Sequence, residues 1–217
     1  MRHPNLLLFL GVSFDTSNLS SCMILTELLP YSLYDILEKQ KLKLTFSEIL
    51  DITHGTIGGL DYLHGHQPTV VHRDISSKNV LYDGRVAKIA DLGQAKVFGG
   101  SNTNSRNTQT AMPGAMVYSA PEVLTGKYSA RIDIFSFGVL FAQLCTGQYP
   151  RIEQRQQQVD AAAARFPQLR NLLHRCLSLH PDMRPTASEI HRAIRSFKED
   201  LRNYTPQQNG AGIVATR

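Results

Sequence analysis

The 217-residue sequence contains no tryptophan, only three cysteines, and no apolar run of the roughly 18 residues that a membrane span requires. It also lacks a C-x-x-C pair, which argues against a zinc site. Cys22, Cys145 and Cys176 each stand beside apolar residues, so we expect reduced core thiols in an intracellular, cytoplasmic protein. This argument leaves open a membrane anchor upstream of the chain.

Charge is modest and evenly spread along the chain. Charged residues make up 19 % of the sequence and the net charge is +5, without a dense block of lysine and arginine. We therefore expect no nucleic-acid partner. The small positive excess fits a partner or substrate that carries phosphates. Hydrophobic residues make up 42 %, which is enough for a folded core.

The beginning of the chain, MRHPNLLLFLGVS, contains a short apolar run between a proline and a glycine. It has neither the basic segment nor the small-residue cleavage site of a secretory signal. We interpret the run as a buried strand, which implies that the chain begins inside a fold.

Hydrophobic spacing and turn residues predict a small amount of sheet followed by a mostly helical region, an α+β fold. The expected strands are 6–10 and 22–27, the expected hairpin is 79–91 around Asp83-Gly84, and the expected helices are 32–40, 45–66, 131–147 and 186–202, with one or two more within 158–179. Ser32 is the expected N-cap of the first helix, and Thr186 with Glu189 forms an expected capping box before the last.

Two further features qualify this outline. The helix at 45–66 contains Gly55, Gly58 and Gly59, which lower its propensity, so another element is expected to pack closely there. Residues 99–114 are polar and aperiodic, which predicts a long functional or disordered loop. The tail at 203–217 is expected to be disordered.

Oxygen-bearing side chains gather around the expected hairpin. Asp74 and Asn79 stand on one charged loop, and Asp91 follows the hairpin. Because a hairpin returns the chain to its starting point, Asn79 and Asp91 should lie close together. Carboxylate and carbonyl oxygens suit Mg²⁺, which takes one or two protein ligands plus phosphates. A separate aspartate near a hydroxyl could accept its proton, which is the layout of phosphoryl transfer.

Five motifs occur in the order in which the protein kinase family carries them. HRDISSKN at 72–79 resembles H-R-D-L-x-x-x-N, DLG at 91–93 resembles D-F-G, and SAPE at 119–122 resembles A-P-E. DIFSFG at 133–138 and PDMRP at 181–185 resemble two further stretches of the family. The sequence therefore resembles a protein kinase domain over about residues 1–200.

The resemblance implies a protein-kinase-like fold in which residues 1–30 are a remnant of the N-lobe with strands and hinge, 31–202 are the mostly helical C-lobe, and 203–217 are the tail. TELLPYSLYDIL resembles the tyrosine kinase and tyrosine-kinase-like groups. It would make Thr26 the gatekeeper and residues 27–30 the adenine-binding hinge. The implied partners are ATP with Mg²⁺ and a protein substrate. The implied ATP-binding residues are Thr26, Glu27, Leu28, Leu29, Leu81 and Asp91.

The family's roles transfer to this chain residue by residue. Asp74 would be the catalytic base, with Lys78 and Asn79 beside it. Asn79 and Asp91 would hold Mg²⁺, and Arg73 would contact a phosphorylated activation loop. Structural roles would fall to the spine residues His72, Leu92 and Phe9, to Gly93, to Asp133 as the tie of the catalytic loop, and to Glu122 and Arg184 as a buried ion pair.

Hydroxyl specificity stays open at the level of sequence. Ser/Thr kinases usually carry Lys at the position of Ser76 and Thr at that of Ala115, whereas tyrosine kinases carry a basic residue at the position of Lys78. Tyr118 stands where tyrosine kinases usually have Trp, which favours Ser/Thr. In the segment between Asp91 and Glu122 the possible phosphorylation sites are Ser101, Thr103, Ser105, Thr108 and Thr110.

The Gly-rich loop and the strand lysine of the family have no counterpart in this chain, because the resemblance begins after them and no G-x-G-x-x-G occurs. We therefore expect weak catalysis from these residues alone. Strands 6–10 and 22–27 would expose apolar faces, and a partner could cover them. The alternative function is a catalytically impaired, kinase-derived binding or regulatory module.

Overall fold

A computed structural model of the chain describes residues 1–14, 22–98, 116–126 and 129–203. The strands are β1 (Phe9–Phe14), β2 (Cys22–Thr26), β3 (Tyr31–Ser32), β4 (Thr69–Val71), β5 (Val80–Tyr82), β6 (Ala87–Ile89) and β7 (Lys96–Phe98). The main helices are α1 (Phe46–Gly65), α2 (Arg131–Thr146), α3 (Arg155–Arg165), α4 (Arg170–Cys176) and α5 (Ala187–Asn203). The single-turn helices are η1 (Asp35–Lys39), η2 (Leu92–Gln94), η3 (Met116–Tyr118), η4 (Pro121–Thr125), η5 (Ile152–Gln154), η6 (Pro167–Leu169) and η7 (Pro181–Met183).

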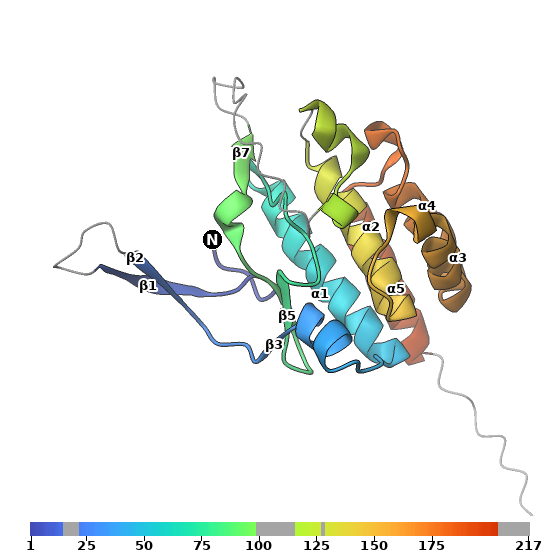
Figure 1. Cartoon of the computed structure of the whole chain (residues 1–217), viewed down its shortest axis with the longest axis horizontal. Helices are drawn as coiled ribbons and strands as arrows, with labels where there is room; N and C mark the ends of the chain where they lie inside the picture. The colour runs from blue at the N-terminus through green and yellow to red at the C-terminus, as the bar shows by residue number, and fades with distance from the viewer. Residues whose placement is uncertain (15–21, 99–115, 127–128, 204–217) are drawn as a thin grey trace, which may run out of the picture.

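The helices form one body, in which α1 and α2 lie side by side and α3 and α4 flank α2 (Figure 1). The helix α1 begins where expected, because the Thr45 side chain accepts from the Glu48 amide while Glu48 accepts from the Thr45 amide. Thr186 and Glu189 make the same reciprocal bonds before α5. Nearly every residue of α2 is buried, as its apolar sequence predicts for a central helix.

The glycines of α1 mark the place where the start of the chain and the β6 strand cross the helix. An added Cβ at Gly59 would lie 2.8 Å from the Asn5 carbonyl oxygen and 2.9 Å from the Ile89 side chain. An added Cβ at Gly55 would lie 2.8 Å from the side-chain amide nitrogen of Asn5 and 3.0 Å from the Ala87 carbonyl oxygen. The expected close packing against these glycines is confirmed.

The expected hairpin at 79–91 is confirmed as the antiparallel pair β5–β6, which β3 extends on the β5 side. Asp83 shapes its turn, because its carboxylate accepts from the amides of Arg85 and Val86. Gly84 has φ +89°, a left-handed conformation that glycine adopts without strain. The hairpin returns the chain from Asn79 to Asp91.

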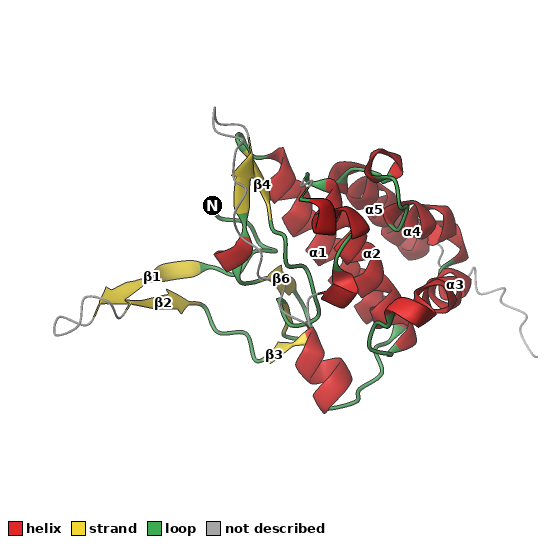
Figure 2. Ribbon diagram, turned by 45° about the horizontal axis from the view of Figure 1, so that its top comes forward, coloured by secondary structure: helices red, strands yellow, loops and turns green. Residues whose placement is uncertain are grey.

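The β1–β2 pair extends away from the helical body (Figures 1 and 2). The first expected strand was placed too early: β1 spans Phe9–Phe14, whereas Leu6 is buried in an isolated bridge to Ile89. Apolar side chains of both strands are exposed, with Ile24 at 70 %. Within the described residues, the expected exposure of apolar faces on these two strands is confirmed.

The expectation for the cysteines was right for two of the three. Cys145 and Cys176 are buried, and burial raises the pKa of each thiol to about 12. Cys22 is exposed on β2, which corrects the expectation of a core thiol. No described helix is long and apolar enough to cross a membrane. The tail was expected to begin at residue 203, but Asn203 still belongs to α5. Residues 204–217 lie outside the described residues.

Candidate active site

The charged loop at 72–79 connects β4 to β5, and one buried carboxylate fixes its shape. Asp133, in the first turn of α2, accepts from the His72 amide at 2.8 Å and from the Arg73 amide at 2.7 Å. The His64 ring lies 2.9 Å from the same carboxylate. Arg73 has φ +72°, so these bonds stabilise a backbone conformation that a non-glycine residue rarely adopts. The expected tie between Asp133 and the loop is confirmed.

His72 is fully buried and holds the backbone of Asp74 in place. Its Nδ1 accepts from the Asp74 amide at 3.2 Å, and its Nε2 lies 3.0 Å from the Ala90 carbonyl oxygen. A neutral ring with the proton on Nε2 satisfies both contacts. His72 therefore joins the loop that carries Asp74 to the strand end that leads to Asp91.

Asp74 and Asn79 are in direct contact across the loop. The Asn79 Nδ2 donates to the Asp74 Oδ2 at 2.8 Å and to the Asp74 carbonyl oxygen, also at 2.8 Å. Because both donors of this amide point at Asp74, its Oδ1 faces away as an acceptor. The Asn79 carbonyl oxygen also accepts from the Ala90 amide at 2.8 Å, which brings the residue before Asp91 to the loop.

Asp91 occupies a left-handed turn, with φ +58°. Its Oδ1 accepts from the Gly93 amide at 2.9 Å, which leaves Oδ2 and the exposed side of the carboxylate available. A Cβ at Gly93 would come within 2.9 Å of that same oxygen, so a side chain at this position would displace the Asp91 carboxylate. The structural role expected of Gly93 thus has a geometric basis.

These oxygens fit the ligand preferences of Mg²⁺. Asn79 Oδ1 and the Asp91 carboxylate are hard oxygen donors on adjacent chain segments. Within the described ranges no group of three His, Cys, Asp or Glu side chains could enclose a metal ion by itself. A cation held here would take one or two protein ligands and complete its shell with phosphate oxygens, as Mg²⁺ does.

The residues expected to bind adenine lie at the end of β2, in the segment that follows it, and on β5, and they differ in exposure. Thr26 and Leu28 are exposed, Leu28 at 93 %, while Leu29 and Leu81 are partly buried. Glu27 is held firmly: its amide donates to the Leu8 carbonyl oxygen at 3.0 Å, and its Oε1 accepts from the Leu8 amide at 2.7 Å.

Lys88 on β6 was not recognised in the sequence, and it is the ion-pair partner of Glu27. Its Nζ lies 2.6 Å and 2.8 Å from the two Glu27 carboxylate oxygens. Burial alone would raise the pKa of Glu27, but the hydrogen bonds from Lys88 and the Leu8 amide outweigh it, so this pKa is lowered. The pair connects the end of β2 to the β5–β6 hairpin.

Two of the expected spine residues, Leu92 and Phe9, differ from His72 in burial. Leu92 is 40 % exposed and Phe9 is 56 % exposed, whereas His72 is fully buried. Continuous stacking would bury all three side chains, so the described structure does not display the expected spine. Lys78 is exposed, and its ammonium lies 5.2 Å from the centre of the Tyr34 ring.

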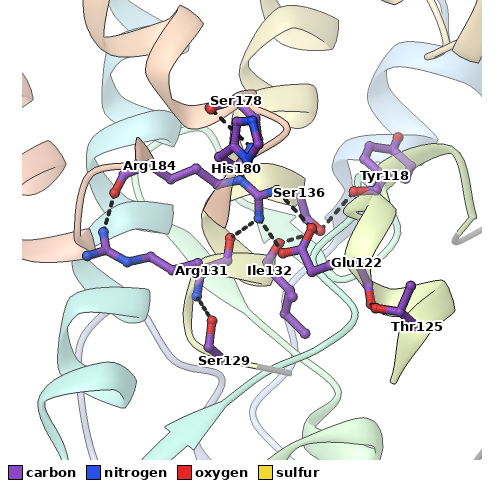
Figure 3. A network of polar contacts seen from close by, with 10 residues as sticks. All are labelled: Tyr118, Glu122, Thr125, Ser129, Arg131, Ile132, Ser136, Ser178, His180 and Arg184. Carbon is purple, nitrogen blue, oxygen red and sulfur yellow. Dashed lines mark hydrogen bonds and ion pairs between the residues drawn. The ribbon is translucent and has the colours of Figure 1, made fainter. Parts of the chain in front are cut away.

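Glu122 and Arg184 form the expected buried ion pair (Figure 3). The two guanidinium nitrogens lie 2.5 Å and 2.8 Å from the two carboxylate oxygens. Arg184 also donates to the carbonyl oxygens of Ser178 and Arg131, and Arg131 donates back to the Arg184 carbonyl oxygen. The ion pair therefore fastens the turn that follows η3 to the segment before α5.

Tyr118 is a buried hub that the sequence did not reveal. Its hydroxyl donates to Gln143 Oε1 at 2.5 Å and lies 2.9 Å from the Ser77 hydroxyl. The Ser136 hydroxyl donates to the Tyr118 carbonyl oxygen at 2.9 Å (Figure 3). Because Ser77 belongs to the charged loop, Tyr118 connects that loop to α2. The expected phosphorylation sites at 101–110 and Ala115 lie outside the described residues.

Comparison with known proteins agrees with this geometry. Residues 1–194 match the family described as the protein kinase domain. The chain is 30 % identical over 220 residues to the serine/threonine-protein kinase STY17 of Arabidopsis thaliana, covering 94 % of this chain and 37 % of that protein. It is 31 % identical over 211 residues to the dual specificity protein kinase pyk3 of Dictyostelium discoideum, covering 91 % of this chain and 15 % of that protein.

A third relative is the dual specificity protein kinase shkB of Dictyostelium discoideum, 31 % identical over 211 residues, with 88 % of this chain and 31 % of that protein covered. The chain spans between 13 % and 37 % of the length of such relatives. The family match covers most of the chain and includes every segment of the site. The chain therefore belongs to the protein kinase domain family.

Proposed function

We propose that the chain transfers the terminal phosphoryl group of ATP to a hydroxyl group of a protein substrate. The observation that carries this proposal is the contact between Asp74 and Asn79, next to the hairpin that leads to Asp91. This contact supports the proposal that a proton acceptor and two oxygen ligands act together at this loop. This is the arrangement that phosphoryl transfer requires.

The chemistry divides among these residues. Asp74 accepts the proton of the substrate hydroxyl as its oxygen bonds to the terminal phosphorus, the bond to the bridging oxygen breaks, and ADP leaves. Asn79 and Asp91 would hold Mg²⁺, which would neutralise charge on the phosphates. Lys78 is exposed beside Asn79 and can approach the same anionic groups. Arg73 lies next to the base and would contact a phosphorylated activation segment.

Residues 1–30 contribute the adenine side of the site in this proposal, and residues 31–202 contribute the catalytic lobe. Thr26, Glu27, Leu28 and Leu29 would border the adenine ring from the end of β2. Leu81 on β5 would contact its face. The fixed backbone around Glu27 supports this assignment, since hydrogen bonding to a base requires a rigid edge.

The substrate hydroxyl is proposed to belong to serine or threonine as well as tyrosine. Relatives named as serine/threonine and dual specificity kinases support this breadth. Tyr118 agrees with a serine/threonine preference, and Lys78 agrees with tyrosine. Phosphoamino-acid analysis of a labelled substrate mixture would distinguish the three hydroxyls.

The test is phosphate transfer from radiolabelled ATP to myelin basic protein and to a glutamate–tyrosine copolymer by the 217-residue chain. Asp74→Asn removes the proton acceptor but keeps the side-chain size, so we expect transfer to fall about 100-fold or more. Asp182→Asn, at an exposed position in η7, is the control. Equal transfer by wild type and Asp74→Asn, or no transfer by a folded wild-type chain, would contradict the proposal.

A binding or regulatory module is the second candidate function. The exposed apolar side chains of β1 and β2 favour it, because a partner that covered them would bury a large apolar area. In that case a folded wild-type chain would transfer no phosphate. The unpaired buried thiols Cys145 and Cys176 agree with a reducing, intracellular compartment for either function.

A further inference from the structure

The segment 116–119, which we call the platform segment, lies against the loop that carries Asp74. Tyr118 reaches Ser77 across 2.9 Å, and Ser77 stands between Asp74 and Asn79 in the sequence. Because this segment contacts the loop that carries Asp74, a shift of the segment would disturb the loop on which a substrate hydroxyl meets the base.

Arg155, the first residue of α3, also contacts the platform segment. Its Nη2 donates to the Val117 carbonyl oxygen at 2.8 Å. Its guanidinium carbon lies 5.1 Å from the centre of the Phe135 ring on α2. A planar guanidinium can stack and donate at the same time, so Arg155 fixes Val117 in both distance and direction.

The surroundings of Arg155 differ from those of an arginine in an ordinary ion pair. Among the described residues it has no carboxylate partner, whereas Arg184, over the same Phe135 ring at 4.9 Å, is paired with Glu122. Half-burial without a carboxylate lowers the pKa of Arg155. Its guanidinium is directed at a backbone carbonyl of the platform segment.

Hydrogen bonds also hold two other residues of this segment, Tyr118 and Ser119. Ser136 binds the Tyr118 carbonyl oxygen, and the Ser119 amide donates to the Met116 carbonyl oxygen at 3.1 Å. Arg155 supplies a contact to the segment from α3. We propose that Arg155 is a positioning residue that sets the platform segment for protein substrates, an inference that rests on the proposed kinase function.

The experiment compares Arg155→Ala and Arg155→Lys with Arg151→Ala, a change at an exposed arginine four positions earlier. In the 217-residue chain, Arg155→Ala should raise the KM for myelin basic protein roughly tenfold and leave the KM for ATP unchanged. Arg155→Lys can donate but cannot stack, so it should give a smaller increase. Arg151→Ala should behave as wild type.

Hydrogen exchange at the Ser119 amide provides the second measurement, because it reports on the platform segment without substrate. Arg155→Ala should speed this exchange while α1 amides keep their protection. A KM for myelin basic protein that rises no more than in Arg151→Ala would overturn the inference. If the wild-type chain transfers no phosphate, the proposed function fails, and hydrogen exchange decides alone: unchanged exchange at Ser119 in Arg155→Ala overturns the role of Arg155.

Discussion

Glu122 and Arg184, 62 positions apart in the sequence, form a two-pronged ion pair in which the arginine side chain is fully buried. The pair closes a connection between η4 and the segment before α5. Burying two charges is costly, and their attraction offsets that cost only while both are present. Removing one partner should therefore lower the stability of the fold by much more than the intact pair adds to it.

Glu122→Gln should therefore lower the free energy of unfolding by about 3 to 5 kcal/mol, because it leaves a buried guanidinium without its counter-charge. Urea denaturation measures this directly. Glu153→Gln, at an exposed position in η5, is the matched control and should change stability by less than about 0.5 kcal/mol. A loss below about 1 kcal/mol for Glu122→Gln would show that solvent compensates Arg184.

Asp133 should act on catalysis through the loop that it holds. In Asp133→Asn, one of the two side-chain acceptors is replaced by a donor that faces the amide of either His72 or Arg73. The loop should shift, and a displacement of about 1 Å at the reacting group can lower a rate about 100-fold. We expect kcat to fall by about that factor with little change in the KM for ATP. Steady-state kinetics test this, with the exposed Asp182→Asn as control; an unchanged kcat would refute it.

Local signals predicted the elements that depend on neighbouring residues. The start of α1 followed from Thr45 and Glu48, and the β5–β6 turn followed from Asp83 and Gly84. The contact between Glu122 and Arg184 was implied only by the resemblance to protein kinases, since no local pattern specifies it. The start of α1 and the hairpin turn could be predicted because neighbouring side chains at fixed spacing specify them.

Other contacts leave no such pattern. The run LLLFL is continuously apolar, so its spacing could not show that Leu6 packs on Ile89 while β1 begins at Phe9. The apolar neighbours of Cys22 suggested a core thiol, whereas the exposure expected of the strand that carries it is what the structure shows. The bond from Arg155 to the Val117 carbonyl oxygen involves a backbone acceptor, and any residue at 117 would provide it.

Gly59 is expected to be intolerant of a side chain. In Gly59→Ala the new methyl group would press on the Asn5 carbonyl oxygen at 2.8 Å, a backbone atom that cannot rotate away. Overpacking of this kind typically costs about 1 to 3 kcal/mol. Gly65, in the last turn of the same helix, has open space around its Cβ position, so Gly65→Ala should leave stability unchanged or raise it by up to about 1 kcal/mol. Equal denaturation midpoints for the two variants would disprove the close approach.

The three thiols should differ sharply in reactivity. Cys22 is exposed, while burial raises the pKa of Cys145 and Cys176 to about 12. Because the thiolate is the reactive form, an aromatic disulfide reagent at pH 8 should modify one thiol per native chain and all three after denaturation. Cys22→Ser should abolish the rapid phase. Rapid modification of that variant would show that the α2 or α4 thiol is accessible.

A cluster of charged groups between α1 and α5 should make stability depend on pH. The ring of His54 on α1 lies 4.9 Å from that of His191 on α5, and Asp51, Arg195 and Lys198 also act on it. Burial, followed by the charges of Lys198 and His191, lowers the pKa of His54 to about 4. The folded chain therefore takes up this proton far less readily than the unfolded chain does.

Because the folded pKa of His54 lies below the usual value of 6.5, the unfolded state binds the proton first as the pH falls. The stability that neutral His54 provides is complete above pH 6.5 and is lost progressively between there and pH 4. His54→Asn cannot titrate, so its urea midpoint should decline less than that of wild type between pH 7 and pH 5. His180→Asn, at an exposed position, should follow wild type. Parallel curves for His54→Asn and wild type would mean that this ring titrates normally in the folded chain.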